Sequence, residues 1–228
     1  RENKMKKLLV LIIFISTTLV AQEPTSTKLG DFNELKVFNG LTVELKKSNT
    51  SKIEVSGSQA DDVSIKNADG ILKIRLKFPE SFIAENVKIV LYYSNNISII
   101  DANEGAYIAS NETINQQHLE VKVQEGAKID LDVTIKHLVV KTVSGGIITL
   151  TGSAENQTVE ANTGGIYYGF DLKSKQTIAT SATGSNIEVR ASDILDAKAQ
   201  FGGSIYYKGS PEVLKSKTVL KGTIQSMN

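Results

Sequence analysis

Apolar and polar residues alternate with a period of two along most of the chain. In the first half, this alternation is clear in six short segments, residues 35–38, 41–46, 52–57, 62–66, 71–77 and 87–93. Alternation of this kind is typical of half-buried β-strands. Asn39-Gly40 and Asp69-Gly70 lie between such segments and are strong turn signals. No segment keeps a helical period over three turns, so the pattern predicts an all-β protein.

Glycines recur at a nearly constant interval in the second half of the chain. The repeat glycines are Gly105, Gly126, Gly146, Gly165, Gly184, Gly203 and Gly222. The interval between successive members shortens slightly over the first three and is constant from Gly146 onwards. A fixed period in this range is the signature of a solenoid, in which each repeat forms one coil stacked on the previous one. We therefore expect a parallel β-helix with coils of about 19–21 residues, whose corners need glycine for a positive φ or for close backbone approach.

The alternation within each repeat predicts which side chains point into the coil. Residues spaced by two lie on one face of a strand, so the positions two, four and six before each repeat glycine are expected to point inward. These positions hold Val140, Thr142, Ser144, Val159, Ala161, Thr163, Ile178, Thr180, Ala182, Ala197, Ala199, Phe201, Thr218 and Leu220. The charged residues between them are expected to face solvent.

The spacing of the early strands suggests that they belong to the same domain. Val37, Val55 and Ile74 follow one another at close to the later coil length. We therefore expect one β-helix domain over residues 32–228, with less regular first coils at 32–100 and regular coils at 101–228. A solenoid has two open ends, and exposed edge strands pair readily. The sequence therefore suggests homo-oligomerisation through the solenoid ends or faces.

The N-terminus has the layout of a secretory signal peptide. Lys6 and Lys7 follow Met5, an apolar run covers residues 8–15, and Ala21 is a small residue at a plausible cleavage point. The apolar run is short for a membrane span. We expect a signal peptide at residues 1–21, including a short upstream extension at 1–4, and a linker at 22–31. Cleavage would leave no transmembrane segment and place the protein in the periplasm, on the outer-membrane surface or outside the cell.

Composition and charge exclude several classes of function. The 228 residues include 26 basic and 25 acidic side chains, which give a net charge of +1. That balance argues against nucleic acid as a partner, because nucleic-acid binding favours a clustered basic excess. Cysteine is absent, so disulfides, thiolate metal sites and a cysteine nucleophile are excluded.

Two segments stand out at the ends of the predicted domain, FNELKVFNGLTVELKKSNTSKIEVSG at 32–57 and FGGSIYYKGSPEVLKSKTVLKGTI at 201–224. They resemble the N-terminal and C-terminal signatures of the head GIN domain family, which is described as "putative auto-transporter adhesin". The resemblance covers roughly residues 31–226 and implies a single-stranded right-handed parallel β-helix from exported bacterial proteins. It carries over no functional residues.

His118 and His137 are the only two histidines, and one coil length separates them in the sequence. If the coil register holds, they stack on adjacent coils and could share a metal ion. Such a site needs further donors, for which Glu120 or Asp130 are candidates. The alternative is two surface imidazoles in a repeat ladder. We therefore expect no metal and no cofactor, with the two histidines as the candidates to examine.

Tyrosine pairs supply candidates for a ligand-binding surface. In Tyr167-Tyr168 and Tyr206-Tyr207, one ring of each pair is expected to point inward and the other outward. Outward rings on one sheet could stack against sugar rings or pack on a partner. Asn186 or Ile187 is expected between the two pairs, one coil from each. The alternative is that the tyrosines reflect β-propensity alone.

These observations predict an exported, non-catalytic β-helix that presents a repetitive surface to a glycan or protein of the cell envelope. One alternative is a carbohydrate-active enzyme, for which Asp130 and Asp132 could act as paired carboxylates on one strand face. Another is a purely structural envelope protein. No catalytic residue is expected, because arginine occurs only at Arg1, Arg75 and Arg190 and the sequence contains no Gly-His-Gly motif.

Overall fold

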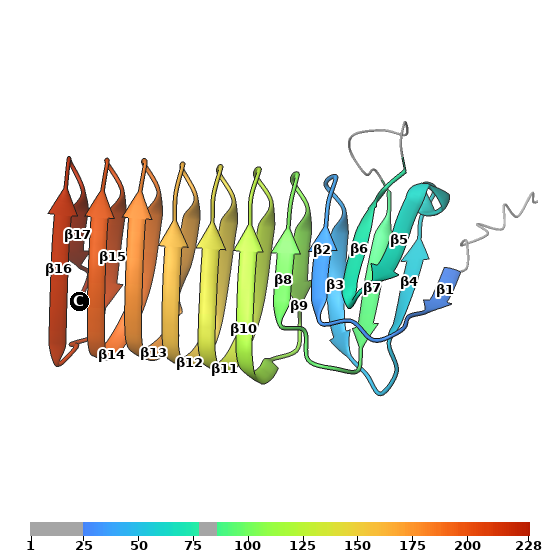
Figure 1. The fold of residues 1–228 in the computed structure, drawn as a ribbon, viewed down its shortest axis with the longest axis horizontal. Helices are drawn as coiled ribbons and strands as arrows, with labels where there is room; N and C mark the ends of the chain where they lie inside the picture. Colours follow the sequence, from blue (N-terminus) through green and yellow to red (C-terminus); the bar gives the residue numbers. More distant parts are fainter. Residues whose placement is uncertain (1–24, 78–85) are drawn as a thin grey trace, which may run out of the picture.

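The computed structural model describes residues 25–77 and 86–228. They form an elongated solenoid, with coils stacked side by side along its long axis (Figure 1). The expected signal peptide at residues 1–21, with its extension at 1–4, lies outside the described residues. Part of the expected linker at 22–31 is instead a strand, β1 (Thr25–Lys28). Within the described ranges, no helix is long and apolar enough to cross a bilayer.

The second half of the chain forms the regular coils of the solenoid. Their strands pair in parallel, and one inward-facing row runs through Ile108, Ile129, Ile148, Tyr167, Ile187, Ile205 and Ile224. Successive members of this row follow one another at close to the interval of the repeat glycines, so the predicted parallel β-solenoid is confirmed. The strands are β8 (Ile99–Ala102), β9 (Tyr107–Ser110), β10 (Ile114–Val123), β11 (Lys128–Thr142), β12 (Ile147–Ala161), β13 (Ile166–Ala182), β14 (Asn186–Gln200), β15 (Ser204–Lys208), β16 (Val213–Val219) and β17 (Thr223–Ser226).

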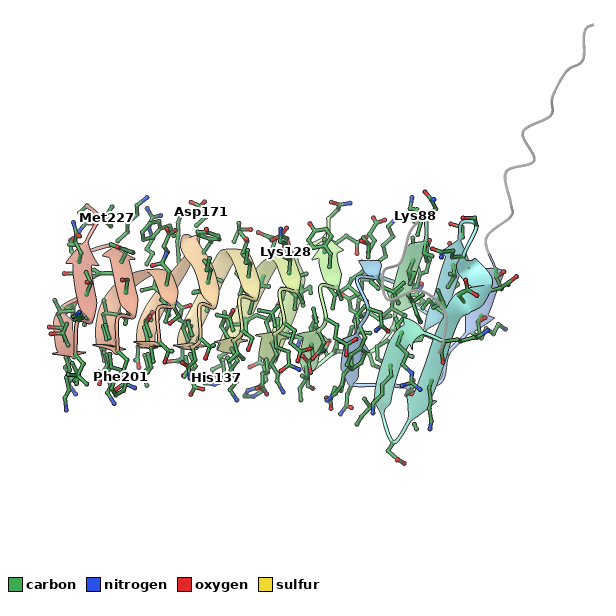
Figure 2. The ribbon with its side chains drawn as sticks, turned by 90° about the horizontal axis from the view of Figure 1, so that it is seen from above. Lys88, Lys128, His137, Asp171, Phe201 and Met227 are labelled. Atoms are coloured by element: carbon green, nitrogen blue, oxygen red, sulfur yellow. The ribbon has the colours of Figure 1, made fainter. Side chains whose placement is uncertain are left out.

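Each regular coil has two long sides that meet at a corner in mid-strand. In β12, Ile148 and Leu150 point inward on the first side, and Gln157 and Val159 point inward on the second. The alternation is interrupted at residues 155–156, where two consecutive side chains point outward. We call the halves that follow each turn side A and the halves that precede it side B. In Figure 2, Lys128 and Asp171 of side A lie opposite His137 of side B.

Two-residue turns join side B of one coil to side A of the next. Ser144 and Gly145 both have positive φ, 49° and 73°, and the Gly146 amide donates to the Val143 carbonyl at 3.0 Å. Two consecutive positive φ values define a type I′ turn. The turns also bond to one another along the axis, since the Gly145 amide donates to the Thr163 carbonyl of the next coil at 3.2 Å. The same φ pattern occurs at Asn39-Gly40, Glu104-Gly105, Glu125-Gly126, Thr163-Gly164, Thr183-Gly184, Phe201-Gly202 and Leu220-Lys221.

The repeat glycines occupy two different turn positions, which corrects the predicted alignment. Gly105, Gly126 and Gly184 have positive φ at the third turn position. The other four, Gly146, Gly165, Gly203 and Gly222, occupy the fourth position, where an added Cβ would lie 2.1–2.6 Å from an atom of the preceding coil.

The one-residue offset at Gly184 changes which side chains of β13 point inward. Ile178 and Thr180 were expected inside, but Ile178 is 54% exposed and Ala179 and Ser181 are the buried residues. The prediction therefore fails in this coil, because a shift of one residue exchanges the two faces of a strand.

The positions two before the repeat glycine also differ from the prediction. Ser144, Thr163, Phe201 and Leu220 were expected to point inward, but all four are exposed. Each is the first residue of its turn with positive φ, so the strand alternation has already ended there. Ala182 is buried because the turn of its coil begins one residue later.

The first strands do not follow the winding order of the later coils. Val37 pairs with Ile74 on one side and with Ala102 on the other, so β2 lies between β6 and β8. Val55, expected in the same winding, instead pairs antiparallel with Ile89 and Thr25. Figure 1 shows this insertion beside β8 and β9. These elements are β2 (Glu34–Val37), β3 (Thr42–Lys47), β4 (Lys52–Ser56), η1 (Ala60–Asp62), β5 (Val63–Ala68), β6 (Ile71–Leu76) and β7 (Lys88–Tyr93).

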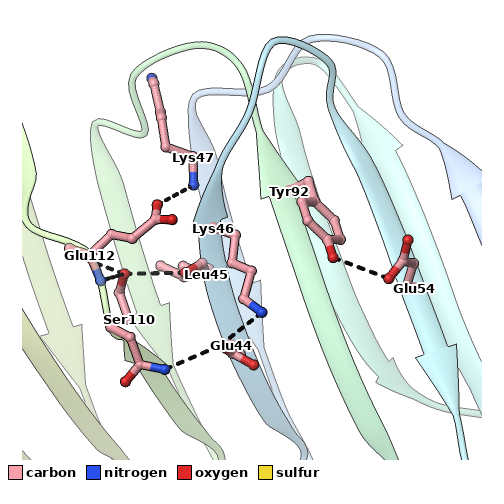
Figure 3. A network of polar contacts seen from close by, with 9 residues as sticks. Glu44, Leu45, Lys46, Lys47, Glu54, Tyr92, Ser110 and Glu112 are labelled. Atoms are coloured by element: carbon pink, nitrogen blue, oxygen red, sulfur yellow. Dashed lines mark hydrogen bonds and ion pairs between the residues drawn. The ribbon is translucent and has the colours of Figure 1, made fainter.

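Polar contacts tie the inserted strand β3 to the loop between β9 and β10 (Figure 3). The Glu112 carboxylate accepts a hydrogen bond from the backbone amide of Lys47 at 2.8 Å, and the side-chain amide of Asn111 donates to the Glu44 carboxylate at 3.2 Å. The Ser110 hydroxyl donates to the Leu45 carbonyl at 3.2 Å. Residues about 65 positions apart in the sequence are therefore held in contact.

The last described coil exposes part of its apolar row. Leu214 is in register with buried Leu195, but it is 46% exposed. It is exposed because β16 pairs only with β14 among the strands that the structure describes. Self-association through solenoid ends or faces stays a prediction.

Candidate functional site

A groove runs along the mid-strand corner, where side A meets side B. It has a volume of about 850 Å³ and crosses the coils of β10 to β14, ending beside the segment after β15. Each coil contributes three consecutive residues to its lining: 115–117, 134–136, 153–155, 173–175 and 190–192, with 209–210 at the end. None of the predicted site residues lies in this lining.

The strand alternation shapes the groove locally. The middle residue of each triplet is buried and forms the floor, in the row Gln116, Ile135, Ala154, Ser174 and Ala191. The residues on either side point outward and form two walls. Ala154, Ser174 and Ala191 are small, so the floor stays low between the walls. The sequence signal for this corner is the pair of polar residues in mid-strand, such as Glu155 and Asn156, which interrupts the period of two.

The walls of the groove carry an excess of positive charge. Lys173 and Arg190 lie on one wall, and Lys136 and Lys175 lie on the other. Glu155 is the single carboxylate of the lining and lies 3.9 Å from the Lys175 ammonium, with both side chains at least half exposed. Such exposed pairs contribute little stability. The other three cations make no ion pair within residues 25–77 and 86–228.

A buried polar cluster lies beneath the groove floor. The Gln157 amide nitrogen donates to the Ser174 and Thr177 hydroxyls, each at 3.0 Å. The Tyr167 hydroxyl donates to the Gln157 side-chain oxygen at 3.2 Å, and the Ser174 hydroxyl donates to the Arg190 carbonyl at 2.8 Å. Buried polar groups stabilise a fold when all of them are paired. The cluster therefore holds the floor at Ser174 and the backbone of Arg190 in place.

The structure separates the four predicted surface tyrosines into two groups. Tyr168 is 40% exposed, and Tyr206 points outward in the same row, with Glu188 between them in register. Ile187 pairs with Tyr167 as expected, but the residue between the outward Tyr168 and Tyr206 is Glu188. Tyr167 is fully buried and Tyr207 packs against the core. Tyr167 therefore cannot contact a ligand at the surface, and Tyr207 remains only partly exposed.

The tyrosine row lies next to the basic end of the groove. Arg190 and Lys208 pair in register two residues beyond Glu188 and Tyr206, on the same face of side A. The Lys208 ammonium lies 4.4 Å from the centre of the Phe170 ring. Burial raises the pKa of Glu188, and the charge of Lys208 partly offsets this effect. The tyrosine row therefore borders the basic end of the groove but lies outside its lining.

The two histidines stack as their spacing predicted. His118 and His137 pair in register, with ring centres 4.9 Å apart and an angle of 15° between the rings. The suggested further donors are engaged elsewhere, because Glu120 pairs with Lys141 at 2.9 Å and Asp130 accepts from Tyr107. In the described part of the chain, no three His, Asp or Glu side chains converge on one point. The expectation that no metal is bound, with His118 and His137 as the candidates, stays a prediction.

Hydroxyl donors surround the two aspartates considered as an acid pair. Asp130 accepts from the Tyr107 hydroxyl at 2.8 Å, and Asp132 accepts from the Thr151 hydroxyl at 2.7 Å and from Thr113. Both aspartates lie on side A and outside the groove lining, with Asp132 two residues before the wall residue Thr134. These hydrogen bonds fix the orientation of both carboxylates.

The contact between Tyr107 and Asp130 predicts a loss of stability at alkaline pH. Burial and this hydrogen bond raise the pKa of Tyr107 to about 12. An unfolded tyrosine ionises near pH 10, so the contribution is complete below pH 10 and is lost as the pH rises towards 12. Tyr107→Phe should flatten this decline in the free energy of unfolding, measured by urea unfolding at pH 8 to 11.5. An unchanged slope in the variant would contradict the assignment.

The chain is thus an elongated β-solenoid with a groove along its mid-strand corner. The chain belongs to the head GIN domain family: residues 31–211 match the family model described as "Putative auto-transporter adhesin, head GIN domain". The resemblance inferred from the two signatures is therefore confirmed. No curated protein matches the sequence.

Several solved structures share the fold over most of their length. A putative adhesin from Bacteroides fragilis has a TM-score of 0.81 at 19% identity, with 90% of this chain and 96% of that chain covered. A putative adhesin from Parabacteroides merdae has a TM-score of 0.70 at 20% identity, covering 90% and 95%. A putative lipid binding protein from Parabacteroides distasonis has a TM-score of 0.69 at 18% identity, covering 90% and 97%.

Proposed function

We propose that the protein is an exported binding module that attaches to a chain-like ligand of the cell envelope through the corner groove. The observation that carries this proposal is the groove itself, which crosses five stacked coils and presents two walls of polar and charged side chains. A groove parallel to the solenoid axis suits an extended ligand, because each coil offers the same two wall positions about 4.8 Å further along. The family description as an adhesin supports the same class of function.

Binding fits the groove better than hydrolysis does. Cleavage of a glycosidic bond by the usual mechanism needs two carboxyl groups that flank the bond. The groove lining contains one carboxylate, Glu155, which lies beside Lys175. The proposal is therefore a non-catalytic role. Export follows from the signal-peptide pattern at residues 1–21 and places the groove in the periplasm, on the outer-membrane surface or outside the cell.

A groove-filling substitution tests the proposal. Thr134 is exposed on one wall, so Thr134→Trp should fill the groove without removing a charge or a buried contact. We expect the affinity of the purified variant for envelope glycans and peptidoglycan fragments to fall by at least about tenfold, which is the size of the loss when a central contact of an interface is removed. Tyr168→Ala should cost less, because Tyr168 flanks the groove.

The matched control places the same ring on side B, outside the groove lining. Thr158 points outward on side B, so Thr158→Trp should leave binding unchanged. Binding is measured on a glycan array and by pull-down with insoluble peptidoglycan. Equal binding by the wild type and Thr134→Trp would show that the groove is not the attachment site.

A further inference from the structure

The charges in the groove are arranged as neighbours of the same sign. Lys173 and Arg190 occupy directly paired positions of β13 and β14 on one wall. Lys175 follows on the other wall, one residue beyond buried Ser174. Like charges in register on adjacent strands repel one another. No carboxylate of the described residues forms an ion pair with Lys173 or Arg190, so both cations are open to an anion that enters the groove.

The lining also lacks the groups that neutral sugars and single-stranded nucleic acids require. None of the residues that line the groove is aromatic. Sequence-tolerant binding of single-stranded nucleic acid depends on aromatic platforms for the bases. Neutral sugars likewise bind by packing on aromatic rings. Recognition in this groove therefore has to come from charge and from hydrogen bonds to the polar walls.

We propose that the groove binds a linear anionic polysaccharide, with carboxylate or sulfate groups repeating along the chain. This inference rests on the proposed function and specifies its ligand. The rise of about 4.8 Å per coil is comparable to the length of one sugar unit, so an extended glycan can bring successive anions to successive coils. Lys173 and Arg190 contact anions from one wall, and Lys136 and Lys175 contact them from the other. Ser153, Thr134 and Asn115 offer hydrogen bonds to sugar hydroxyls.

Removing the negative charge of Glu155 tests the proposal, because it should raise the affinity for an anionic glycan. Glu155 is the single negative group in the lining, and it partly neutralises Lys175 at 3.9 Å. Glu155→Gln removes a repulsive charge and frees a cation, so affinity for an anionic glycan should rise by about two- to fourfold, as expected for one exposed charge contact. A gain of affinity cannot arise from misfolding.

The loss-of-charge variant tests the same site in the opposite direction. Lys136→Gln, Lys173→Gln and Arg190→Gln combined should weaken binding of polygalacturonate by about tenfold or more, the sum of three modest charge contacts. The matched control removes three cations from the other face, as Lys198→Gln, Lys217→Gln and Lys221→Gln. It changes the net charge equally and should weaken binding less than about twofold.

The experiment measures binding of the purified protein to polygalacturonate, chondroitin sulfate, neutral dextran and a single-stranded DNA oligonucleotide, at low and high salt. We expect salt-sensitive binding of the first two and none of dextran. Equal loss in the groove triple and its control, no gain in Glu155→Gln, or equal affinity for DNA would overturn the inference. If polyanions fail but a neutral envelope glycan binds and is lost in Thr134→Trp, the anionic assignment fails and the proposed function stands.

Discussion

Tyr167→Ala should lower the free energy of unfolding by about 4 kcal/mol, as measured for other large-to-small changes in a packed core. The Tyr167 side chain is fully buried and continues the central isoleucine row through the middle of the solenoid. Its ring also covers Gly169, where an added Cβ would lie 2.5 Å from a ring carbon. Removing the ring leaves a cavity and deprives Gln157 of its hydroxyl donor.

The neighbouring tyrosine provides the control. Tyr168 has the same side chain one residue later, but it is 40% exposed on side A. Tyr168→Ala should therefore cost less than about 1 kcal/mol. Tyr167→Phe keeps the ring and loses the hydroxyl, so it should cost about 1–2 kcal/mol. Urea unfolding at 25 °C, followed by circular dichroism, measures all three variants. Similar losses for Tyr167→Ala and Tyr168→Ala would contradict the assigned faces.

Gly165→Ala should cost about 3 kcal/mol, because it forces a methyl group into a closely packed position. Gly165 has ordinary φ, but its Cβ would lie 2.5 Å from the Thr142 carbonyl oxygen in the preceding coil. That oxygen also accepts the Asn162 amide at 2.9 Å. The backbone of one coil would have to move away from the other to admit the methyl group.

Substituting the preceding glycine, Gly164, distinguishes the cost of a steric clash from the cost of a left-handed backbone conformation. Gly164 has a φ of 71°, and nothing lies within 4 Å of its added Cβ. Gly164→Ala should therefore cost only about 1 kcal/mol, the penalty for a left-handed conformation. Gly164→Asn should cost less, since Asn tolerates this region. Thermal and urea unfolding of the three variants provide the measurement. A larger loss at Gly164 than at Gly165 would refute the two roles assigned to these glycines.

The separation of the two glycine roles also explains why the corner groove is regular. The turns fix where each coil begins, and the number of residues between them fixes where the mid-strand corner falls. The coil that contains Tyr167 and Gly169 is one residue longer than its predecessor, with a register shift between β12 and β13. The shift is absorbed before Lys173, so Lys173 and Ser174 still pair with Ser153 and Ala154. The groove walls therefore stay continuous across the irregular coil.

The sequence by itself determined the solenoid, its coil length and the stacking of His118 on His137. These features repeat locally, and one regular period of glycines and alternating strands is enough to specify them. The family could also be recognised from the sequence, because both family signatures are continuous segments of the chain. The sequence could not specify whether each repeat glycine occupies the third or the fourth turn position, because the residue is glycine in both cases. That one-residue difference decides which side chains of the adjoining strand point inward.

Only the tertiary structure decided which residues meet across the molecule. The insertion of β2 and β3 between strands from later in the chain depends on pairings between residues that are far apart in the sequence, and no local pattern encodes them. The groove has the same origin. Lys136, Lys173 and Arg190 lie on three different coils and line one groove only when the coils stack in register. Charge excess at the groove is therefore a property of the stacked structure, while the whole chain carries a net charge of only +1.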